Sequence, residues 1–356
     1  MNKSLTVGMV FFFVILSPLF SQNNAEFKRV GQWKHDELLT HDTFSFIDKD
    51  NNLVAAMGRG YSMVMTPNKI TKFGFFGQAP NDLTLTRAGF FYKGDLAIVE
   101  QTDKIKVFTR KGENYVWKET KWLKRGIWAH IIREGLFYDG KFFISGMEGI
   151  SDETGPLKTF YKKYSHLKVY AENGDSLKQL IQKSFDNPTF LIELKYHLAG
   201  YHSDRVFFMP ANELKVSAIS TNTLAVAKEV QLEAPSFYKK MPETFYAWDE
   251  NIMKKGFGKH FVLFDEWEMG YSSVQEMVVD GNTLVVQIRT ANPKMKKFAL
   301  LFYNADSFKL EKTVFLDDYL LDVKDGKYYT YQNGNPGLDD DTEECIINIY
   351  SFVSKK

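Results

Sequence analysis

The 356-residue sequence has a single cysteine and no surplus of charge of either sign. Cys345 alone cannot form an internal disulfide, and its apolar surroundings in 345–350 indicate a buried small side chain rather than a nucleophile. Lys3 is the only charged residue in positions 1–21, so the remainder carries 44 basic and 44 acidic residues. This balance lacks the excess of Lys and Arg that binds phosphate backbones, so nucleic acid is not an expected partner.

Enzyme motifs are also missing. The sequence has no Gly-x-Ser-x-Gly, no His-Glu-x-x-His, no phosphate loop and no paired-cysteine metal site. Two acidic segments, 48–52 and 338–344, carry oxygen ligands suited to calcium. In the first, Leu53 and Arg59 stand where a calcium loop needs Gly and a bidentate Glu, which favours an ordinary turn. We expect no cofactor, with calcium at the second segment as the alternative to a solvated loop.

The N-terminus is the one long apolar stretch. Lys3 precedes an apolar run from Leu5 to Phe20, and the small residue Ser21 follows it, which is the order of a secretory signal peptide. A membrane anchor is the alternative, but Pro18 and the polar residues after Ser21 favour cleavage. We therefore expect residues 1–21 to be removed and the remainder to be periplasmic or secreted, with no membrane span.

A repeated unit organises the rest of the chain. Six times, a turn rich in Asp, Gly or Asn is followed at once by an apolar burst. The bursts begin at Leu53, Leu96, Phe142, Val206, Leu284 and Tyr328. Three of the five spacings are 43, 46 and 44 residues, whereas the other two, 64 and 78, indicate the same unit with insertions. Repeats of this length are typical of propeller blades.

Further strands and hairpin turns follow each burst, as at 104–108 with the turn 110–113 and at 167–170 with the turn 172–175. The hairpins require antiparallel sheets, while the consecutive apolar residues require both faces of a strand to be covered. Blades of a β-propeller meet both conditions. We predict an all-β, six-bladed propeller of four-stranded antiparallel blades over residues 22–356, with insertions near 145–165 and 234–272. A large β-sandwich is the alternative.

The final unit has only three strands of its own, 319–323, 327–332 and 345–352. A short blade leaves an exposed edge, which ring closure removes. The strand-like segment 26–33 lies ahead of the first blade. We predict that it supplies the outer strand of the last blade and closes the ring.

Segment 73–82, followed by a strand, the Gly94-Asp95 turn and the strand 104–109, resembles the inter-blade region of bacterial six-bladed propellers of the NHL and TolB-like kind. In that family the segment typically reads Gly-x-Gly-Pro-Gly-Glu-Phe. Ala79 and Asn81-Asp82 depart from this pattern. The resemblance implies a propeller fold but little about chemistry, because its exported members are functionally scattered.

Polar residues at equivalent places in several units form the candidate site. Loops that enter the innermost strands converge on one mouth of the central channel, where a concave polar surface is the default binding site. The candidates are His41, Arg87, His130 and His197, with Arg59, Trp128, Glu148, Tyr271 and Arg289 around them. These side chains suit an anionic or carbohydrate-like ligand. The aromatic insertion 234–272 is an alternative partner surface or lid.

Two functions remain open. The first is an exported binding or interaction propeller, whose ligand is a small molecule, a carbohydrate or a protein. The second is a metal-centred hydrolase or lyase of the lactonase-like kind, which needs Glu, Asn and Asp at the starts of the inner strands. The expected starts show His, Arg, Trp and Tyr instead, which favours the first, although the sequence does not decide whether the protein is an enzyme.

Overall fold

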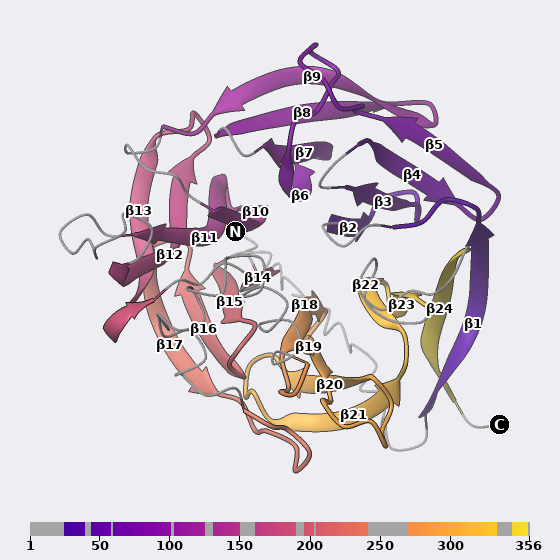
Figure 1. Cartoon of the computed structure of the whole chain (residues 1–356), viewed down its shortest axis with the longest axis vertical. Coiled ribbons are helices and arrows are strands. Elements are labelled where there is room, and N and C mark those ends of the chain that lie inside the picture. Colours follow the sequence, from indigo (N-terminus) through magenta and orange to yellow (C-terminus); the bar gives the residue numbers. More distant parts are fainter. Residues whose placement is uncertain are drawn as a thin grey trace, which may run out of the picture.

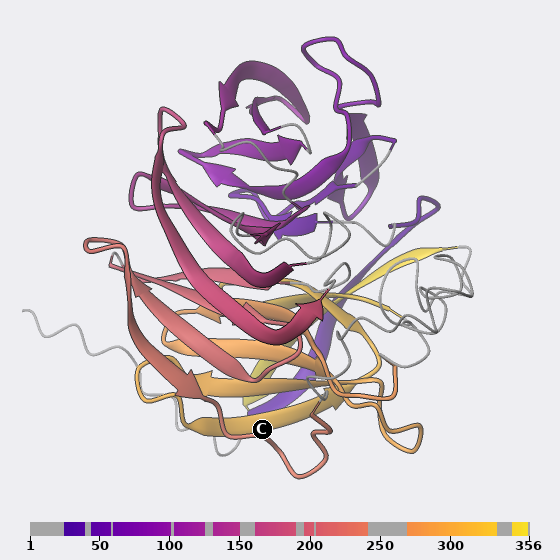
Figure 2. The same ribbon diagram turned by 60° about the vertical axis from the view of Figure 1, so that its left-hand side comes forward.

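The computed structural model is a six-bladed β-propeller, made of six four-stranded antiparallel sheets around a central axis (Figures 1 and 2). The predicted fold class is therefore confirmed. The structure describes residues 25–39, 44–57, 60–100, 103–124, 131–149, 161–189, 196–202, 204–240, 269–332 and 344–354. Within these ranges no helix is long and apolar enough to cross a membrane.

In each of the first five blades the strands follow one another in chain order from the axis outward (Figure 1). Blade 1 contains β2 (Phe44–Ile47), β3 (Leu53–Ala56), β4 (Ser62–Thr66) and β5 (Lys69–Phe73). Blade 2 contains β6 (Thr86–Tyr92), β7 (Asp95–Glu100), β8 (Lys104–Lys111) and β9 (Asn114–Trp122). Blade 3 contains β10 (Ile131–Tyr138), β11 (Lys141–Gly149), β12 (Tyr161–Ala171) and β13 (Ser176–Thr189).

The second half of the ring continues in the same way. Blade 4 contains β14 (Tyr196–Tyr201), β15 (Arg205–Pro210), β16 (Lys215–Ser220) and β17 (Ala225–Gln231). Blade 5 contains β18 (Val274–Asp280), β19 (Thr283–Arg289), β20 (Phe298–Asn304) and β21 (Leu310–Leu316). Blade 6 contains β22 (Tyr319–Lys324), β23 (Lys327–Tyr331), β24 (Cys345–Ser354) and, as its outer strand, β1 (Ala25–His35).

The polar turns of the repeat connect the first and second strands of the blades. Both central residues have positive φ in the turns Lys93-Gly94, Asp139-Gly140 and Asp325-Gly326, as a type I′ hairpin turn requires. Every apolar burst begins within one residue of the start of a second strand. The six-fold repeat read from the sequence is thus the repeat of the blades.

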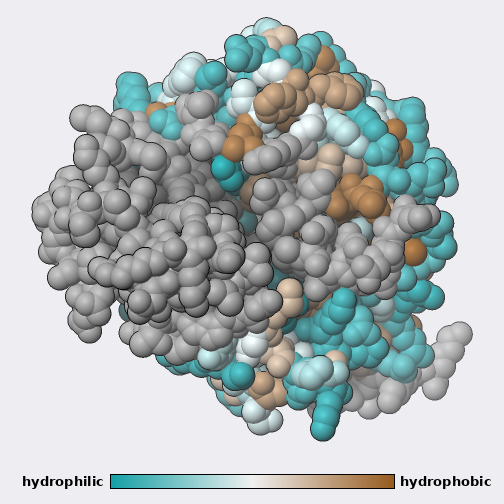
Figure 3. Space-filling model, in the orientation of Figure 1, coloured by the Kyte–Doolittle hydropathy of each residue, from teal (hydrophilic) through white to brown (hydrophobic). Residues whose placement is uncertain are grey.

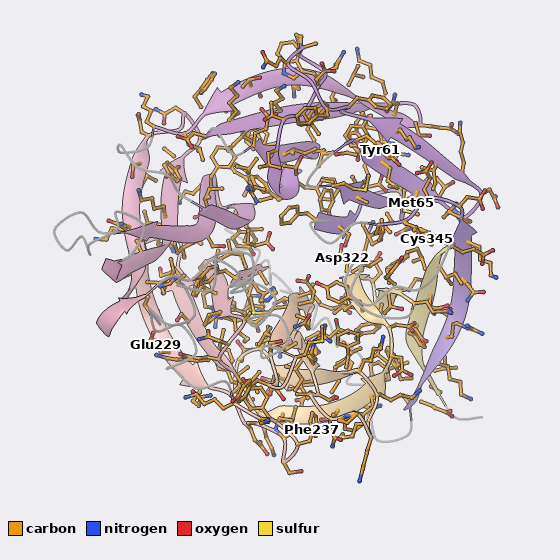
Figure 4. The ribbon with its side chains drawn as sticks, in the orientation of Figure 1. Tyr61, Met65, Glu229, Phe237, Asp322 and Cys345 are labelled. Carbon is orange, nitrogen blue, oxygen red and sulfur yellow. The ribbon has the colours of Figure 1, made fainter. Side chains whose placement is uncertain are left out.

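The predicted insertions lie in the connections after β11 and after β17, mostly outside the described residues. The ends of the second insertion are joined, because Lys239 and Ser272 exchange two hydrogen bonds of 2.8 and 3.0 Å. Near this junction Phe237 packs against Phe315 of β21 with ring centroids 5.1 Å apart (Figure 4). The described start of the insertion therefore packs on blade 5, its neighbour in the ring.

Hydrophobic side chains between neighbouring blades form the core. One cluster joins blades 1 and 2, with Val54 and Ala56 against Leu96 and Ile98, all essentially unexposed. Equivalent clusters join blades 2 and 3, 3 and 4, and 4 and 5, and the largest joins blades 5, 6 and 1. Both faces of the second strands are thus removed from water, which explains why the bursts are continuously apolar. The described outer rim is mainly hydrophilic, with hydrophobic patches between (Figure 3).

Glycines on the inner strands allow close contact with the preceding blade. A Cβ built on Gly89 would lie 2.9 Å from a ring carbon of Phe46, and one on Gly135 would lie 2.7 Å from a ring carbon of Phe90. The same relation recurs at Gly200, where a Cβ would lie 2.2 Å from Tyr138. An aromatic side chain of one blade therefore occupies the space above a glycine of the next.

The two ends of the chain close the ring. β1 pairs antiparallel with β24 from Ala25 opposite Ser354 to His35 opposite Cys345. Phe27 stacks on Tyr350 of β24 with centroids 5.1 Å apart, and Trp33 is buried against Tyr329. The predicted closure by the N-terminal strand is confirmed.

We expect Gly135→Ala to lower the free energy of unfolding by about 1–3 kcal/mol, because the new methyl group overlaps the ring of Phe90. Chemical denaturation measures this. Gly31→Ala is the control, since its Cβ would approach no atom closer than 3.4 Å. Equal unfolding midpoints for the two variants would contradict the proposed packing.

Removal of residues 22–34 should lower the melting temperature by many degrees, because β24 becomes an unpaired edge and the cluster around Trp33 is opened. Val30→Ala on the same strand is the control, because Val30 is 52% exposed. Differential scanning calorimetry on both proteins tests the closure, and an unchanged melting temperature after the deletion would argue against it.

Candidate functional site: the central channel

A cavity of about 370 Å³ lies on the axis of the ring, and all six inner strands contribute to its wall. Polar wall residues are Ser45, Glu134, Tyr196, His197, Gln275, Glu276, Tyr319 and Asp322. Apolar wall residues include Phe44, Phe46, Phe90, Phe91, Leu136, Phe137, Leu198, Met277 and Val278. The channel thus combines an apolar surface with a few polar groups, as small-molecule sites do.

One layer of this wall can be defined from strand pairing. Six residues, one from each inner strand, pair with the equivalent position of the second strand, and we name them the mouth layer because they lie toward the starts of the inner strands. They are Phe44, Ala88, Glu134, His197, Glu276 and Tyr319, and all of them except Ala88 line the cavity. Glu134, His197 and Glu276 come from consecutive blades and make this part of the wall polar.

Each carboxylate of the channel follows a β-bulge. The pairing register shifts just before Glu134, just before Glu276 and just before Asp322. In each case a carboxylate oxygen accepts a hydrogen bond from the backbone N–H of the next residue, at 2.9, 2.9 and 2.7 Å respectively. A bulge redirects the side chain that follows it. The repeated geometry fixes the three carboxylates at the channel wall.

His197 is almost fully buried, with 2% of its surface exposed. Its Nε2 lies 3.4 Å from the carbonyl oxygen of Val274, and its Nδ1 lies 3.6 Å from Oε1 of Glu276. The second distance is too long for a hydrogen bond. Among the described residues Nδ1 therefore has no hydrogen-bond partner.

Asp322 lies where blade 6 meets blade 1, and its side chain is at the inner side of the ring (Figure 4). One carboxylate oxygen accepts the backbone N–H of Ile47 of β2 at 2.6 Å. Burial raises the pKa of Asp322 to about 7, and the negative charge of Glu276 adds to this, although the bonds from Ile47 and Val323 act in the opposite direction. Tyr319 is itself buried, and this burial raises the pKa of its hydroxyl. The negative charges of Glu276 and Glu134 act in the same direction.

Aromatic side chains form the other part of the wall. Phe46 and Phe91 meet edge to face with centroids 5.0 Å apart, and Phe137 contacts Tyr92 in the same way at 4.7 Å. Phe44, Phe46, Phe91 and Phe137 are only half-buried. They come from blades 1 to 3, whereas the ionisable groups come from blades 3 to 6, where they stand beside aliphatic wall residues such as Leu198 and Met277. One side of the channel is therefore aromatic and the other carries the ionisable groups.

The structure fully describes four of the nine predicted site residues, namely Arg87, His197, Tyr271 and Arg289. Of these four, His197 lines the cavity. Arg87 is the bulge residue of β6, and Arg289 ends β19 with its guanidinium over the ring of Phe298. Tyr271 lies ahead of β18 with the Lys239 ammonium over its ring. Glu148 pairs with Ser165, but its side chain is not described. The other four, His41, Arg59, Trp128 and His130, lie outside the described residues.

Sequence reasoning did not find Glu134, Glu276 or Asp322. Glu134 and Glu276 each lie eight residues before the first apolar residue of the following burst, Phe142 and Leu284. Alignment of the six units on their hairpins would have revealed this spacing. The bulge before each carboxylate has no comparable signal in the sequence.

The first calcium candidate, the loop 48–52 of blade 1, binds side chains of blades 2 and 6. Arg110 of β8 pairs with Asp48 and, at 2.7 Å, with Asp50. Lys324 of blade 6 donates to the Asp48 carbonyl at 2.5 Å. A guanidinium thus occupies the carboxylates that a calcium ion would need. The second candidate, 338–344, lies almost wholly outside the described residues.

The sequence matches no known protein-family profile and no curated protein. Solved structures share its fold. A member of the DUF4221 family from Bacteroides vulgatus superposes with a TM-score of 0.59 and 11% identity, over 94% of this chain and 100% of its own. A protein from Bacteroides fragilis, described by the words "putative exported protein", superposes with a TM-score of 0.53 and 12% identity, over 93% and 95% of the two chains. At such identities the likeness shows the propeller fold alone.

We expect the raised pKa of Asp322 to make the fold less stable as the pH rises from about 4 to about 7, because only the folded chain keeps this proton in that window. Above the folded pKa the effect levels off. The melting temperature of the wild type, compared with that of Asp322→Asn, should therefore fall between about pH 4 and about pH 7 and change little above that.

Asp325→Asn is the control, since Asp325 is exposed on the neighbouring hairpin turn. A wild-type minus Asp322→Asn difference that is constant with pH would show that Asp322 titrates normally.

Proposed function

We propose that the chain is an exported binding propeller that holds a small organic molecule in its central channel. The observation that carries this is the cavity of about 370 Å³, whose wall is aromatic on one side and carries the ionisable groups on the other. The volume lies within the range of small-molecule sites. Polar groups from blades 3 to 6 can fix the orientation of a ligand, while the phenyl rings of blades 1 to 3 bury its apolar part.

Export is part of the proposal. It is supported by the order of charged, apolar and small residues in positions 1–21 and by the exported description of one structural neighbour. Kinship with NHL and TolB-like propellers is supported by segment 73–82, which lies between the last strand of blade 1 and the first strand of blade 2, as an inter-blade segment should.

The metal-centred hydrolase is the second candidate, and the carboxylates of Glu134, Glu276 and Asp322 are in its favour because they lie on inner strands. Within the described ranges, however, no three His, Cys, Asp or Glu residues are close enough to hold one metal ion. Binding without a resident metal therefore agrees better with the described part of the wall.

Ligand-observed NMR with a collection of amines, sugars and carboxylic acids tests the binding proposal. We expect Leu198→Trp, which adds an indole at the channel wall, to abolish binding of the compounds that bind the wild type. Leu177→Trp is the matched control, because Leu177 is 45% exposed on the outer strand β13. Equal binding by the two variants would exclude the channel as the site.

A further inference from the structure

We infer that the channel binds an organic cation, with an ammonium or guanidinium group held between His197 and Glu276 and an apolar portion against the phenyl rings of blades 1 to 3. This inference rests on the proposed function, because it names the class of ligand for the same cavity. It differs from the anionic or carbohydrate-like ligand expected from the sequence.

The charge of the wall is the first argument. Three of the wall residues are acidic, and none of the described ones is Lys or Arg. Lys324, the cation that acts on Asp322, donates to the Asp48 carbonyl of blade 1. A wall whose described residues carry carboxylates, Glu276 among them, and no Lys or Arg attracts a cation and repels an anion.

The contact between His197 and Glu276 is the second argument. The carbonyl oxygen of Val274 can only accept, so Nε2 of His197 carries the hydrogen at that contact. In the neutral ring Nδ1 is then an acceptor, and it faces the acceptor Oε1 of Glu276 at 3.6 Å. A group that donates to both acceptors would make this contact favourable without a charge on the imidazole. An ammonium or guanidinium group supplies several N–H donors at one point.

Glu276 has further capacity to accept. Its Oε1 accepts the N–H of Met277 at 2.9 Å, while its Oε2 accepts no hydrogen bond from the described part of the chain. The Glu276 side chain lines the cavity and is 24% exposed, so a ligand in the cavity can reach it. A charge-assisted hydrogen bond to this oxygen is stronger than one between neutral groups.

The aromatic side chains of the wall indicate what the uncharged part of the ligand is. Phe46, Phe91 and Phe137 each lie one position from the hairpin end of their strand, deeper than the mouth layer. A molecule that places its cation beside Glu276 can therefore extend an apolar or aromatic body toward these rings. Offset or edge-to-face packing with a phenyl group would add to the area it buries.

Phenethylammonium is a probe with both features, and phenethyl alcohol and phenylpropionate are neutral and anionic analogues of similar size. Isothermal titration of the full chain should show that phenethylammonium binds about tenfold or more tightly than either analogue. Glu276→Gln keeps an oxygen for the N–H of Met277 but removes the charge. It should weaken phenethylammonium by about tenfold or more and leave phenethyl alcohol unchanged.

Glu229→Gln is the control variant, because Glu229 is 49% exposed on the outer strand β17, at the rim of the ring (Figure 4). Equal effects of the two Glu→Gln changes, tighter binding of phenylpropionate, or no binding of any probe would overturn the inference. Leu198→Trp could abolish binding of an anionic or neutral probe while Glu276→Gln has no effect. In that case the channel is still the binding site, but its ligand is not a cation. Binding of phenethylammonium that survives Leu198→Trp would contradict the proposed function itself.

Discussion

The ring depends on one pairing, in which the first strand of the chain lies along the last. β1 and β24 join residues 25–35 to residues 345–354 and complete the sixth blade from both ends of the sequence. Polar contacts reinforce the joint: Asn348 of β24 accepts from Gln32 at 2.8 Å and donates to the buried Asp318 at 2.7 Å. Each of the other five blades is continuous in sequence, so this is the blade whose strands must be brought together over almost the whole chain.

Closure also sets the shape of the channel, because each blade then has two neighbours. The inner strands approach one another closely through contacts such as Phe46 on Gly89 and Phe90 on Gly135. Bulges in the same strands turn Glu134 and Glu276 toward the axis, and Asp322 ties the inner strand of blade 6 to that of blade 1. Packing between blades and the chemistry of the cavity therefore depend on the same short strands.

The sequence predicts the architecture well because its signals are local. Turns such as Asp139-Gly140 followed at once by an apolar burst mark each blade, and the three-strand final unit implies that the N-terminal segment completes it. The residues of the site are harder to predict from the sequence, because they depend on the pairing register of the inner strands. His197 was found by its place ahead of a burst, but Glu134 and Glu276 reach the channel through bulges that shift the pairing by one residue. Such a shift changes the face on which a side chain lies.

The order in which the strands are made has a consequence for folding. β1 is synthesised first, but its partner β24 is completed only at Ser354, close to the C-terminus. Blades 1 to 5 can each form from neighbouring segments, whereas the sixth must wait until β24 has been made. A contact between residues more than 300 positions apart, such as Arg29 with Asn348, forms slowly because a very long loop must close. A chain that lacks β24 leaves β1 without its partner strand, so the sixth blade stays incomplete whatever the state of the other five.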